Sequence, residues 1–291
     1  MKPFVTLALC LTAAGGLSAQ STINSTQKLA WAANTGWLNL RSSPEDGVVV
    51  GSYVFSGYVY GANTGWLHLG TGTPQDHVRY GNTDSADFGV NVMSGGLLRG
   101  LAYGANIGWV SFETVGDPRL NLATGAMSGY AYGANIGWIN LGDLSFQLIT
   151  DTIQPGADTD QDQLADAWEY QRAGGLTLLA NPGDADGDGV SDLNEYLADT
   201  QPLAAIDAFT VGQTQFTKTQ TGDVQFTLTW RSSPDRLYAI EYRDDLAPGP
   251  WTDSGLGIFA GGTGTNTTRT VTGPPTARRF YRTRVQLPLH P

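Results

Sequence analysis

The stretch Gly-Tyr-Val-Tyr-Gly-Ala-Asn-Thr-Gly-Trp-Leu-His-Leu, residues 57–69, contains a pentapeptide that decides the fold of the first half of the chain. This pentapeptide, Ala-Asn-Thr/Ile-Gly-Trp, occurs four times and ends at Trp37, Trp66, Trp109 and Trp138. Another aromatic residue stands six positions before each Trp: Trp31, Tyr60, Tyr103 and Tyr132. Because Asn and Gly accept the left-handed backbone conformations that tight turns require, each copy predicts two strands joined by a hairpin turn.

The strand expected after each turn alternates between apolar and polar residues. The apolar members occupy the first and third positions after the Trp: Leu38 and Leu40, Leu67 and Leu69, Val110 and Phe112, Ile139 and Leu141. Side chains of a strand alternate between its two faces, so these residues should share one face and the Trp residues the other. A single hairpin cannot bury both faces, and the four units are therefore expected to form one sheet system. We predict a repeat domain of four β-hairpin units over residues 24–150.

The four Trp residues allow two interpretations. In the first, each Trp and its aromatic neighbour form a cross-strand pair that packs one unit against the next. In the second, the Trp residues form a platform for sugar rings, since an aromatic face matches the apolar side of a pyranose. The candidate ligand-binding residues are then Trp37, Trp66, Trp109 and Trp138. Over residues 28–142 the repeat also resembles a Gly-Tyr-Ala-Trp/Tyr…Asn-x-Gly-Trp-Ile repeat of secreted bacterial proteins, and this resemblance implies no particular activity.

Charge is concentrated in one window of the chain. The chain holds 27 acidic and 16 basic residues, a formal net charge of −11. Between residues 151 and 200, twelve acidic residues stand against one basic residue, Arg172, so this window accounts for the entire net charge. Because the window lies between two strand-rich regions of balanced charge, its composition favours a cation site over a solvated tail.

Two twelve-residue stretches of this window have the spacing of a calcium-binding loop. Acidic loop 2, residues 184–195, offers the side chains of Asp184, Asp186, Asp188, Asp192 and Glu195 and the backbone carbonyl of Val190. Acidic loop 1, residues 158–169, offers the side chains of Asp158, Asp160, Asp162, Asp166 and Glu169 and the carbonyl of Leu164. Oxygens at these spacings can surround one Ca²⁺ ion. Loop 2 has Gly189 at its sharp turn where loop 1 has Gln163, so we predict two calcium sites, the second of which binds more tightly.

Each acidic loop leads into a short helix and has no helix before it. Helices are expected over residues 164–172 and 191–198, while Pro and Gly residues precede both loops. Loop–helix units of this kind resemble thrombospondin type 3-like and EF-hand-like calcium-binding repeats over residues 156–202. The resemblance implies a calcium-binding connector, which we place at residues 151–203.

The region from residue 204 to 291 is again rich in strands. Phe226, Leu228 and Trp230 alternate with polar residues, and a second alternating run follows at residues 238–242. About seven short strands fit within this region, which is the size of a β-sandwich. The order of its aromatic and aliphatic residues resembles a fibronectin type III-like or immunoglobulin-like domain. The chain as a whole is therefore predicted to be mainly β.

The first nineteen residues have the pattern of a signal peptide. Lys2 precedes a short apolar run at residues 4–14, and Leu17-Ser18-Ala19 fits a cleavage site. The apolar run is too short to span a bilayer, and no later segment predicts a membrane span. The one cysteine, Cys10, lies in this leader, so no disulfide is expected in the exported chain. We expect the protein to be secreted, either extracellular or at the cell surface.

Composition and motifs argue against two classes of function, nucleic-acid binding and catalysis. The net charge of −11 argues against a nucleic-acid partner. With three His residues, no His-Glu-x-x-His motif and no nucleophile elbow, the sequence predicts no enzyme. We therefore expect an exported, calcium-binding, non-catalytic structural or adhesion protein. The alternative is a lectin-like glycan-binding protein, or a non-catalytic part of a polysaccharide-degrading system. The expected partners are calcium and a glycan or other cell-surface polymer.

Overall fold

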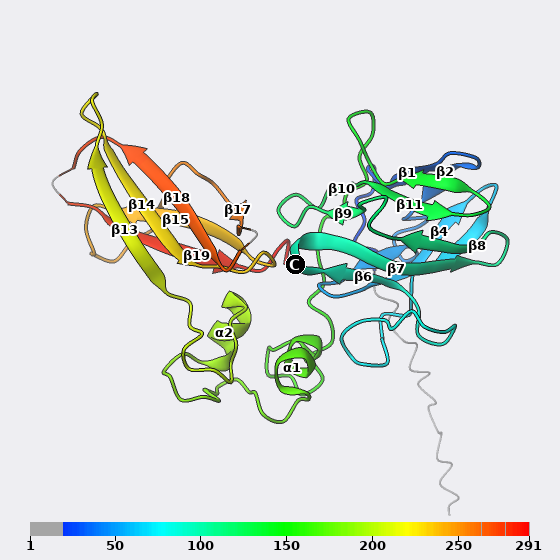
Figure 1. The fold of residues 1–291 in the computed structure, drawn as a ribbon, viewed down its shortest axis with the longest axis horizontal. Coiled ribbons are helices and arrows are strands. Elements are labelled where there is room, and N and C mark those ends of the chain that lie inside the picture. Colours follow the sequence, from blue (N-terminus) through cyan, green and yellow to red (C-terminus); the bar gives the residue numbers. More distant parts are fainter. Residues whose placement is uncertain (1–19, 263, 277, 291) are drawn as a thin grey trace, which may run out of the picture.

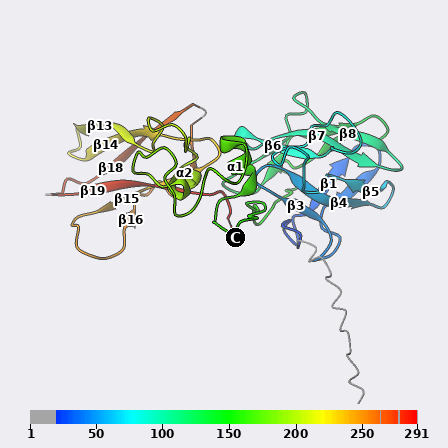
Figure 2. The ribbon, with the colours of Figure 1, turned by 90° about the horizontal axis from the view of Figure 1, so that it is seen from below.

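The structure, a computed structural model, describes residues 20–262, 264–276 and 278–290 (Figure 1). The predicted signal peptide at residues 1–19 lies outside the described residues. Over these residues the chain is mainly β, as predicted, with two short α-helices, α1 (Asp166–Ala173) and α2 (Asp192–Ala198). The strands gather at the two ends of the molecule, and both helices lie between these ends (Figures 1 and 2). Within the described ranges, neither helix has the length and apolar character needed to cross a membrane.

The first half of the chain forms a closed antiparallel barrel of eight strands. In order around the barrel they are β7 (Leu97–Gly104), β5 (Gly65–His68), β4 (Phe55–Gly61), β2 (Gly36–Asn39), β1 (Leu29–Ala32), β12 (Gly137–Asn140), β11 (Tyr130–Gly133) and β8 (Gly108–Phe112). The barrel closes because β8 pairs with β7 as well as with β11. All strands that flank the four pentapeptides thus belong to one sheet, as expected, and closure pairs the edges that an open sheet would expose.

Side-chain alternation gives these strands an inner apolar face and an outer aromatic face. The apolar residues that follow each Trp are all buried in one core: Leu38, Leu40, Leu67, Leu69, Val110, Phe112, Ile139 and Leu141. The four Trp residues lie outside, with 42–50% of their surface exposed. The predicted two-faced strand is therefore confirmed, and side chains fill the barrel interior as expected for a barrel of this size.

The turns within the pentapeptides correct one expectation. The Gly before each Trp has the expected left-handed backbone, with φ between 74° and 87° at Gly36, Gly65, Gly108 and Gly137. None of the four Asn residues has a positive φ. Instead, three of the Asn side-chain amides donate a hydrogen bond to a carbonyl of the preceding pentapeptide: Asn63 to Thr35 (2.9 Å), Asn106 to Thr64 (3.2 Å) and Asn135 to Ile107 (3.0 Å). Asn therefore ties neighbouring turns together and does not supply backbone freedom.

Short additional strands and one long loop complete this region. The additional strands are β3 (Val48–Val50), β6 (Val90–Met93), β9 (Arg119–Leu120) and β10 (Met127–Ser128). The longer spacing between Trp66 and Trp109 accommodates a loop at residues 69–89. The loop is anchored by the buried Tyr80, whose hydroxyl donates to the Phe55 carbonyl at 3.1 Å. The inserted residues therefore fold onto the barrel.

Two antiparallel sheets form the C-terminal region. One contains β13 (Val211–Lys218), β14 (Val224–Arg231) and β18 (Asn266–Gly273). In the other, β15 (Leu237–Arg243) pairs with β16 (Thr252–Asp253), β17 (Phe259–Ala260) and β19 (Phe280–Gln286). Both sheets contribute to one core, which consists of Leu228, Trp230, Tyr238, Ile240 and Val271. The two alternating runs found in the sequence supply four of these five residues.

The connector contacts both β regions. Its own buried core consists of Leu164, Ala165, Trp168, Leu179 and Tyr196. Tyr53, just before β4, and Leu287, just after β19, pack against this core. Beyond Leu287, the chain reaches the barrel, where the Leu289 carbonyl accepts a hydrogen bond from the Ile153 N–H at 3.0 Å. The connector and the C-terminal tail therefore hold the barrel and the C-terminal sheets together.

Candidate metal centre

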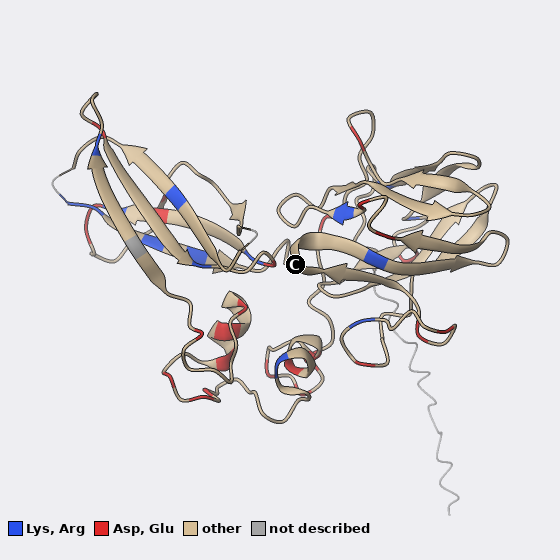
Figure 3. Cartoon of the chain, in the orientation of Figure 1, with Lys and Arg blue, Asp and Glu red and all other residues tan. Residues whose placement is uncertain are grey.

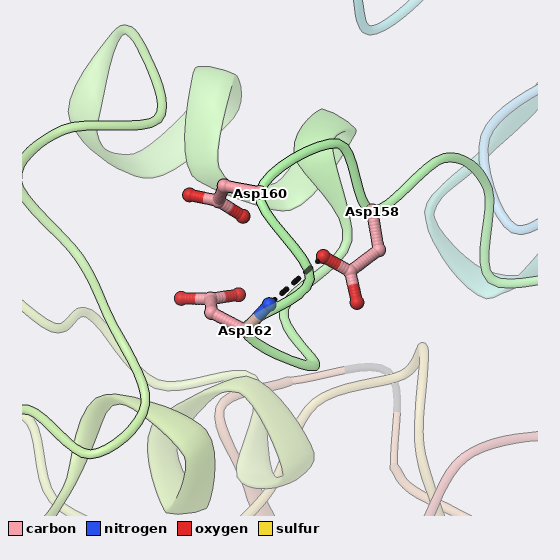
Figure 4. A group of neighbouring side chains, drawn as sticks. All are labelled: Asp158, Asp160 and Asp162. Atoms are coloured by element: carbon pink, nitrogen blue, oxygen red, sulfur yellow. Dashed lines mark hydrogen bonds between the residues drawn. The ribbon is translucent and has the colours of Figure 1, made fainter.

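Three aspartates converge in each acidic loop. In loop 1, one carboxylate oxygen from each of Asp158, Asp160 and Asp162 lies within 4.8 Å of the other two (Figure 4). The equivalent residues of loop 2 are brought together in the same way: Asp184, Asp186 and Asp188. Acidic residues are correspondingly dense over the connector (Figure 3). Carboxylates this close repel one another, and a cation between them would remove the repulsion.

The first aspartate of each loop also shapes the loop. Asp158 accepts hydrogen bonds from the N–H groups of Asp162 (3.1 Å) and Gln163 (3.0 Å). In loop 2, Asp184 accepts hydrogen bonds from the N–H of Gly187 (2.8 Å), one position earlier than in loop 1, and from the N–H of Gly189 (2.9 Å), the counterpart of Gln163. Each loop is therefore folded around its acidic centre by its own backbone.

A buried glutamate stands at the last position of each loop. Glu169 in α1 is 0% exposed and Glu195 in α2 is 1% exposed. Among the residues that the structure describes, neither carboxylate oxygen of Glu169 has a hydrogen-bond partner. One oxygen of Glu195 also has none there, while the other accepts from the Thr200 hydroxyl at 3.3 Å. Burial, together with the charges of the loop aspartates, raises the pKa of Glu169 to about 8 and that of Glu195 to about 7. Burial of an unpartnered carboxylate is costly, and a positive ion beside these glutamates could offset that cost.

The aspartate at the ninth position of each loop has a different environment from the converging three. Asp166 accepts hydrogen bonds from the Thr159 N–H (2.7 Å) and the Thr159 hydroxyl (2.5 Å). Asp192 accepts from the N–H groups of Ala185 (2.9 Å) and Ala180 (3.0 Å). Asp166 and Asp192, two of the predicted ligands, therefore bond to the second residue of their own loop. They do not belong to the groups of three converging aspartates.

The two residues whose carbonyls are predicted ligands contact the converging aspartates through their N–H groups. The N–H of Leu164 donates to Asp162 at 2.8 Å, and the N–H of Val190 donates to Asp188 at 2.7 Å. The seventh residue of each loop is therefore bound directly to the fifth. Of the six predicted ligand positions, the first, third and fifth are gathered, and the twelfth is buried nearby under the influence of their charges.

The backbone distinguishes the two loops. Residues at the fourth and sixth positions are left-handed in both, with φ of 64° and 77° at Gln161 and Gln163 and 75° and 94° at Gly187 and Gly189. Gln163 therefore adopts the left-handed backbone that Gly189 adopts in loop 2. The left-handed backbone of Gln161 was not predicted, although Gly187 at the equivalent position of loop 2 was an available signal. A left-handed residue other than Gly costs about 1–2 kcal/mol, and loop 1 contains two such residues, Gln161 and Gln163.

Both helices predicted after the loops are confirmed to within two residues. Helix α1 ends at Gly174, which has a left-handed backbone (φ 77°). The hydroxyl of Ser191 caps α2 by accepting from the Asn194 N–H at 3.3 Å, and α2 ends at the left-handed Asp199. Each helix carries its loop's final glutamate in its first turn and thereby fixes its position.

Two arginines outside the loops hold the end of α2, a role that was not predicted from the sequence. The guanidinium of Arg236, in the turn before β15, donates to the carbonyls of Tyr196 (2.6 Å) and Leu197 (2.9 Å). Arg172 of α1 donates to Asp199. The only signal available in the sequence was that Arg172 is the one basic residue of the acidic window.

The four candidate ligand-binding Trp residues lie elsewhere, on the outer face of the barrel. Each is paired across strands with its aromatic neighbour, with ring centroids 4.9–5.0 Å apart in the pairs Trp31–Trp37, Tyr60–Trp66, Tyr103–Trp109 and Tyr132–Trp138. These cross-strand pairs form within one hairpin and not between hairpins, because the paired strands are consecutive in the chain. The pairs therefore account for the aromatic spacing, while their outer faces stay accessible to a ligand.

Comparison of the chain with protein-family models, with curated proteins and with solved structures finds no match.

Proposed function

We propose that the connector binds two calcium ions and that the chain is an exported, non-catalytic structural or adhesion protein. The observation that carries this proposal is the burial of Glu169 and Glu195 without sufficient hydrogen-bond partners beside converging aspartates. Each loop then offers oxygens at its first, third, fifth and twelfth positions, the last as a bidentate carboxylate. An ion at each loop would relieve the repulsion and couple metal binding to the ordering of the connector.

The ligand chemistry favours calcium over other metals. Neither loop contains a His or Cys, so every available ligand is an oxygen, and hard cations prefer oxygen. Calcium accepts six to eight oxygens in flexible geometry, whereas magnesium demands a tighter octahedron and sheds water reluctantly. Extracellular modules of this kind bind calcium at about 10⁻⁴–10⁻³ M, which suits an exported protein.

We infer that the four pentapeptide hairpins are repeats of one unit and that the C-terminal sheets form a fibronectin type III-like β-sandwich. Matching cross-strand registers in the four hairpins support the first inference. The core shared by the two C-terminal sheets supports the second. A metal-stiffened connector between two β modules suits a structural or adhesive role more than catalysis, and we assign no catalytic residue.

The test is calorimetric titration of the exported chain, residues 20–291, after removal of metal with a chelator. We expect two calcium sites of unequal affinity, with the tighter one in loop 2, because loop 2 has Gly at both left-handed positions. Glu195→Gln should abolish the tighter site and Glu169→Gln the weaker one. Both substitutions keep the side-chain shape and remove a buried charge, so the protein should remain folded.

Magnesium at the same concentration is the control, and it should produce weaker binding at both loops. If millimolar calcium produces no heat, or if neither glutamine variant alters the titration, the calcium proposal is wrong.

The exposed aromatic residues of the barrel favour a second candidate function, glycan binding. Sugar rings need accessible aromatic faces, and the four Trp side chains are 42–50% exposed. The partner would then be a neutral glycan or another cell-surface polymer. A screen of the full chain against immobilised glycans tests this function independently of the calcium titration.

A further inference from the structure

A groove beside the second hairpin has the composition of a sugar-binding site. It lies on the outside of the barrel, between the loop at residues 42–47 and strands β4 and β5, and has a volume of about 710 Å³. Its side-chain lining includes Glu45, Asp46, Ser56, Tyr58, Trp66 and His68. The groove thus combines aromatic rings with hydrogen-bonding groups, as binding sites for small polar ligands do.

Neighbouring side chains hold the aromatic part of the groove in place. Tyr58 and Trp66 are each 50% exposed. The Tyr58 ring stacks on His68 at 4.5 Å between centroids and meets Trp66 edge-on at 6.3 Å. On its other side, His68 contacts the Phe88 ring at 5.4 Å. Because these rings are already fixed, little conformational freedom would be lost when a ligand stacks on them.

The polar part of the groove is acidic and lacks positive charge. Glu45 and Asp46 lie in an exposed turn, which is closed by the Ser43 N–H donating to the Asp46 carbonyl at 3.2 Å. Burial lowers the pKa of His68, which favours the uncharged form of its imidazole. Among the described residues that line the groove, none is Lys or Arg. The lining therefore offers acceptors for hydroxyl groups and would repel an anion.

Trp37 and Trp109 each contact a Phe ring, whereas the rings around Trp66 are Tyr rings. The edge of Phe146 meets Trp37 at 5.2 Å, and the edge of Phe88 meets Trp109 at 5.0 Å. The ring contacts of Trp66 are with Tyr58 and Tyr60. Trp138 has the same aromatic surroundings, Tyr130 and Tyr132, but does not line the acidic groove.

We propose that this groove binds a neutral pyranose, whose apolar face stacks on Trp66 while its hydroxyls donate to Glu45 and Asp46. This assignment deepens the glycan-binding candidate and rests on it, since it names the site and the class of sugar. Polymers of uronic acids are excluded because the groove offers them carboxylates and no cation.

The experiment titrates the exported chain, in millimolar calcium, with cellohexaose, xylohexaose and mannohexaose and with oligogalacturonate as the anionic probe. We expect at least one neutral hexasaccharide to bind with a dissociation constant of about 1 mM or tighter, and no binding of oligogalacturonate. Trp66→Ala should weaken the binding at least about tenfold, while Tyr130→Ala, which removes an exposed aromatic ring outside the groove, should leave it unchanged. The double variant Glu45→Gln/Asp46→Asn, in an exposed turn, should weaken binding several-fold without lowering the melting temperature.

The outcomes distinguish sugar binding in this groove from glycan binding elsewhere on the protein. If a neutral sugar binds but Trp37→Ala or Trp138→Ala removes the binding and Trp66→Ala does not, the protein binds glycans elsewhere and this site is wrong. Preference for oligogalacturonate would also overturn the site. If neither the hexasaccharides nor immobilised glycans bind, the site and the glycan-binding function both fail.

Discussion

Arg172 in α1 and Asp199 at the end of α2 form an ion pair, with the guanidinium Nη2 2.8 Å from the carboxylate Oδ1. The Ser233 hydroxyl donates to the other carboxylate oxygen of Asp199, Oδ2, at 2.6 Å. The Nη2 atom of Arg236 lies 3.7 Å from Oδ1. Burial alone would raise the pKa of Asp199, but the charges of Arg236 and Arg172 and the Ser233 hydrogen bond hold it below its usual value. One carboxylate thus joins both loop–helix units to the C-terminal sheets.

Replacing Asp199 should destabilise the whole connector. Asp199→Ala would leave Arg236, whose side chain is 8% exposed, without its nearest acidic partner. Removing one member of a buried ion pair costs about 3 kcal/mol, and urea unfolding monitored by fluorescence would measure the loss. The control is Asp117→Ala, because the Asp117–Arg119 pair is about half exposed on both sides and should contribute under about 1 kcal/mol. Equal stability of the two variants would show that Asp199 does not join these elements.

The raised pKa values of Glu169 and Glu195 predict an unusual dependence of stability on pH in the absence of calcium. The folded values, about 8 and about 7, exceed the ordinary value of 4.5, so the folded chain holds protons that the unfolded chain has released. With respect to these groups, stability should therefore be greatest below about pH 4.5, where folded and unfolded chains are both protonated, and fall as the pH rises to about 8. Melting temperatures measured in chelator across this range test the direction. Calcium should remove the decline, and a melting temperature that rises with pH in chelator would contradict this explanation.

Much of the architecture follows from local patterns in the sequence. The alternation after Trp37 and its three counterparts predicts which face is buried, because the period of a strand requires no long-range information. The spacing of Asp184, Asp186 and Asp188 likewise predicts that they converge, because a twelve-residue loop must bring them together. Closure of the barrel was not predictable in this way. It depends on pairing β1 with β12, strands more than a hundred residues apart, which no local pattern specifies.

The unpredicted parts of the candidate site have the same cause. Ser233 and Arg236 reach Asp199 across more than thirty residues, and neither belongs to a recognisable motif. The role of Asn63 and its counterparts was misassigned because Asn is common in turns for its backbone, whereas here its side chain bonds to the preceding turn. Burial of Glu169 also depends on tertiary packing, since α1 alone would leave it exposed.

Removing an outer aromatic residue should cost far less than removing an inner one. Trp109 is 42% exposed and contacts Tyr103 and Phe88, so Trp109→Ala should lose about 1–2 kcal/mol. Phe112, three residues later on the same strand, is 5% exposed, and Phe112→Ala should lose about 3–5 kcal/mol through the cavity that it leaves. Denaturant titration of both variants makes the comparison. An equal or larger loss of unfolding free energy for Trp109→Ala would show that packing on the outer face stabilises the barrel at least as much as its core does.

Relieving the strained backbone of acidic loop 1 should strengthen its calcium site. Gln161→Gly and Gln163→Gly would each remove a left-handed penalty of about 1–2 kcal/mol, part of which is offset by the greater freedom of Gly in the unbound loop. We expect about tenfold tighter binding for the double variant, which would bring loop 1 close to loop 2. Calorimetric titration with Glu195→Gln in the background isolates the loop 1 site. The reverse change, Gly189→Gln, should weaken calcium binding by loop 2. If neither the Gly substitutions nor this reverse change alters calcium affinity, backbone strain does not determine it.

The barrel should fold without the C-terminal region, although it should lose some stability. Its interior is filled by its own side chains, so deletion of residues 204–291 should leave a cooperative unfolding transition. The deletion nevertheless removes Leu289, which packs against the barrel core and accepts the hydrogen bond of the Ile153 N–H. Since Ile153 is 3% exposed, uncovering this end of the core should cost about 1–2 kcal/mol. Leu289→Ala in the full-length chain is the matched control and should reproduce most of the loss at the barrel. Near-ultraviolet circular dichroism follows the outer Trp pairs, and disappearance of their signal on truncation would show that the barrel depends on the C-terminal region to fold.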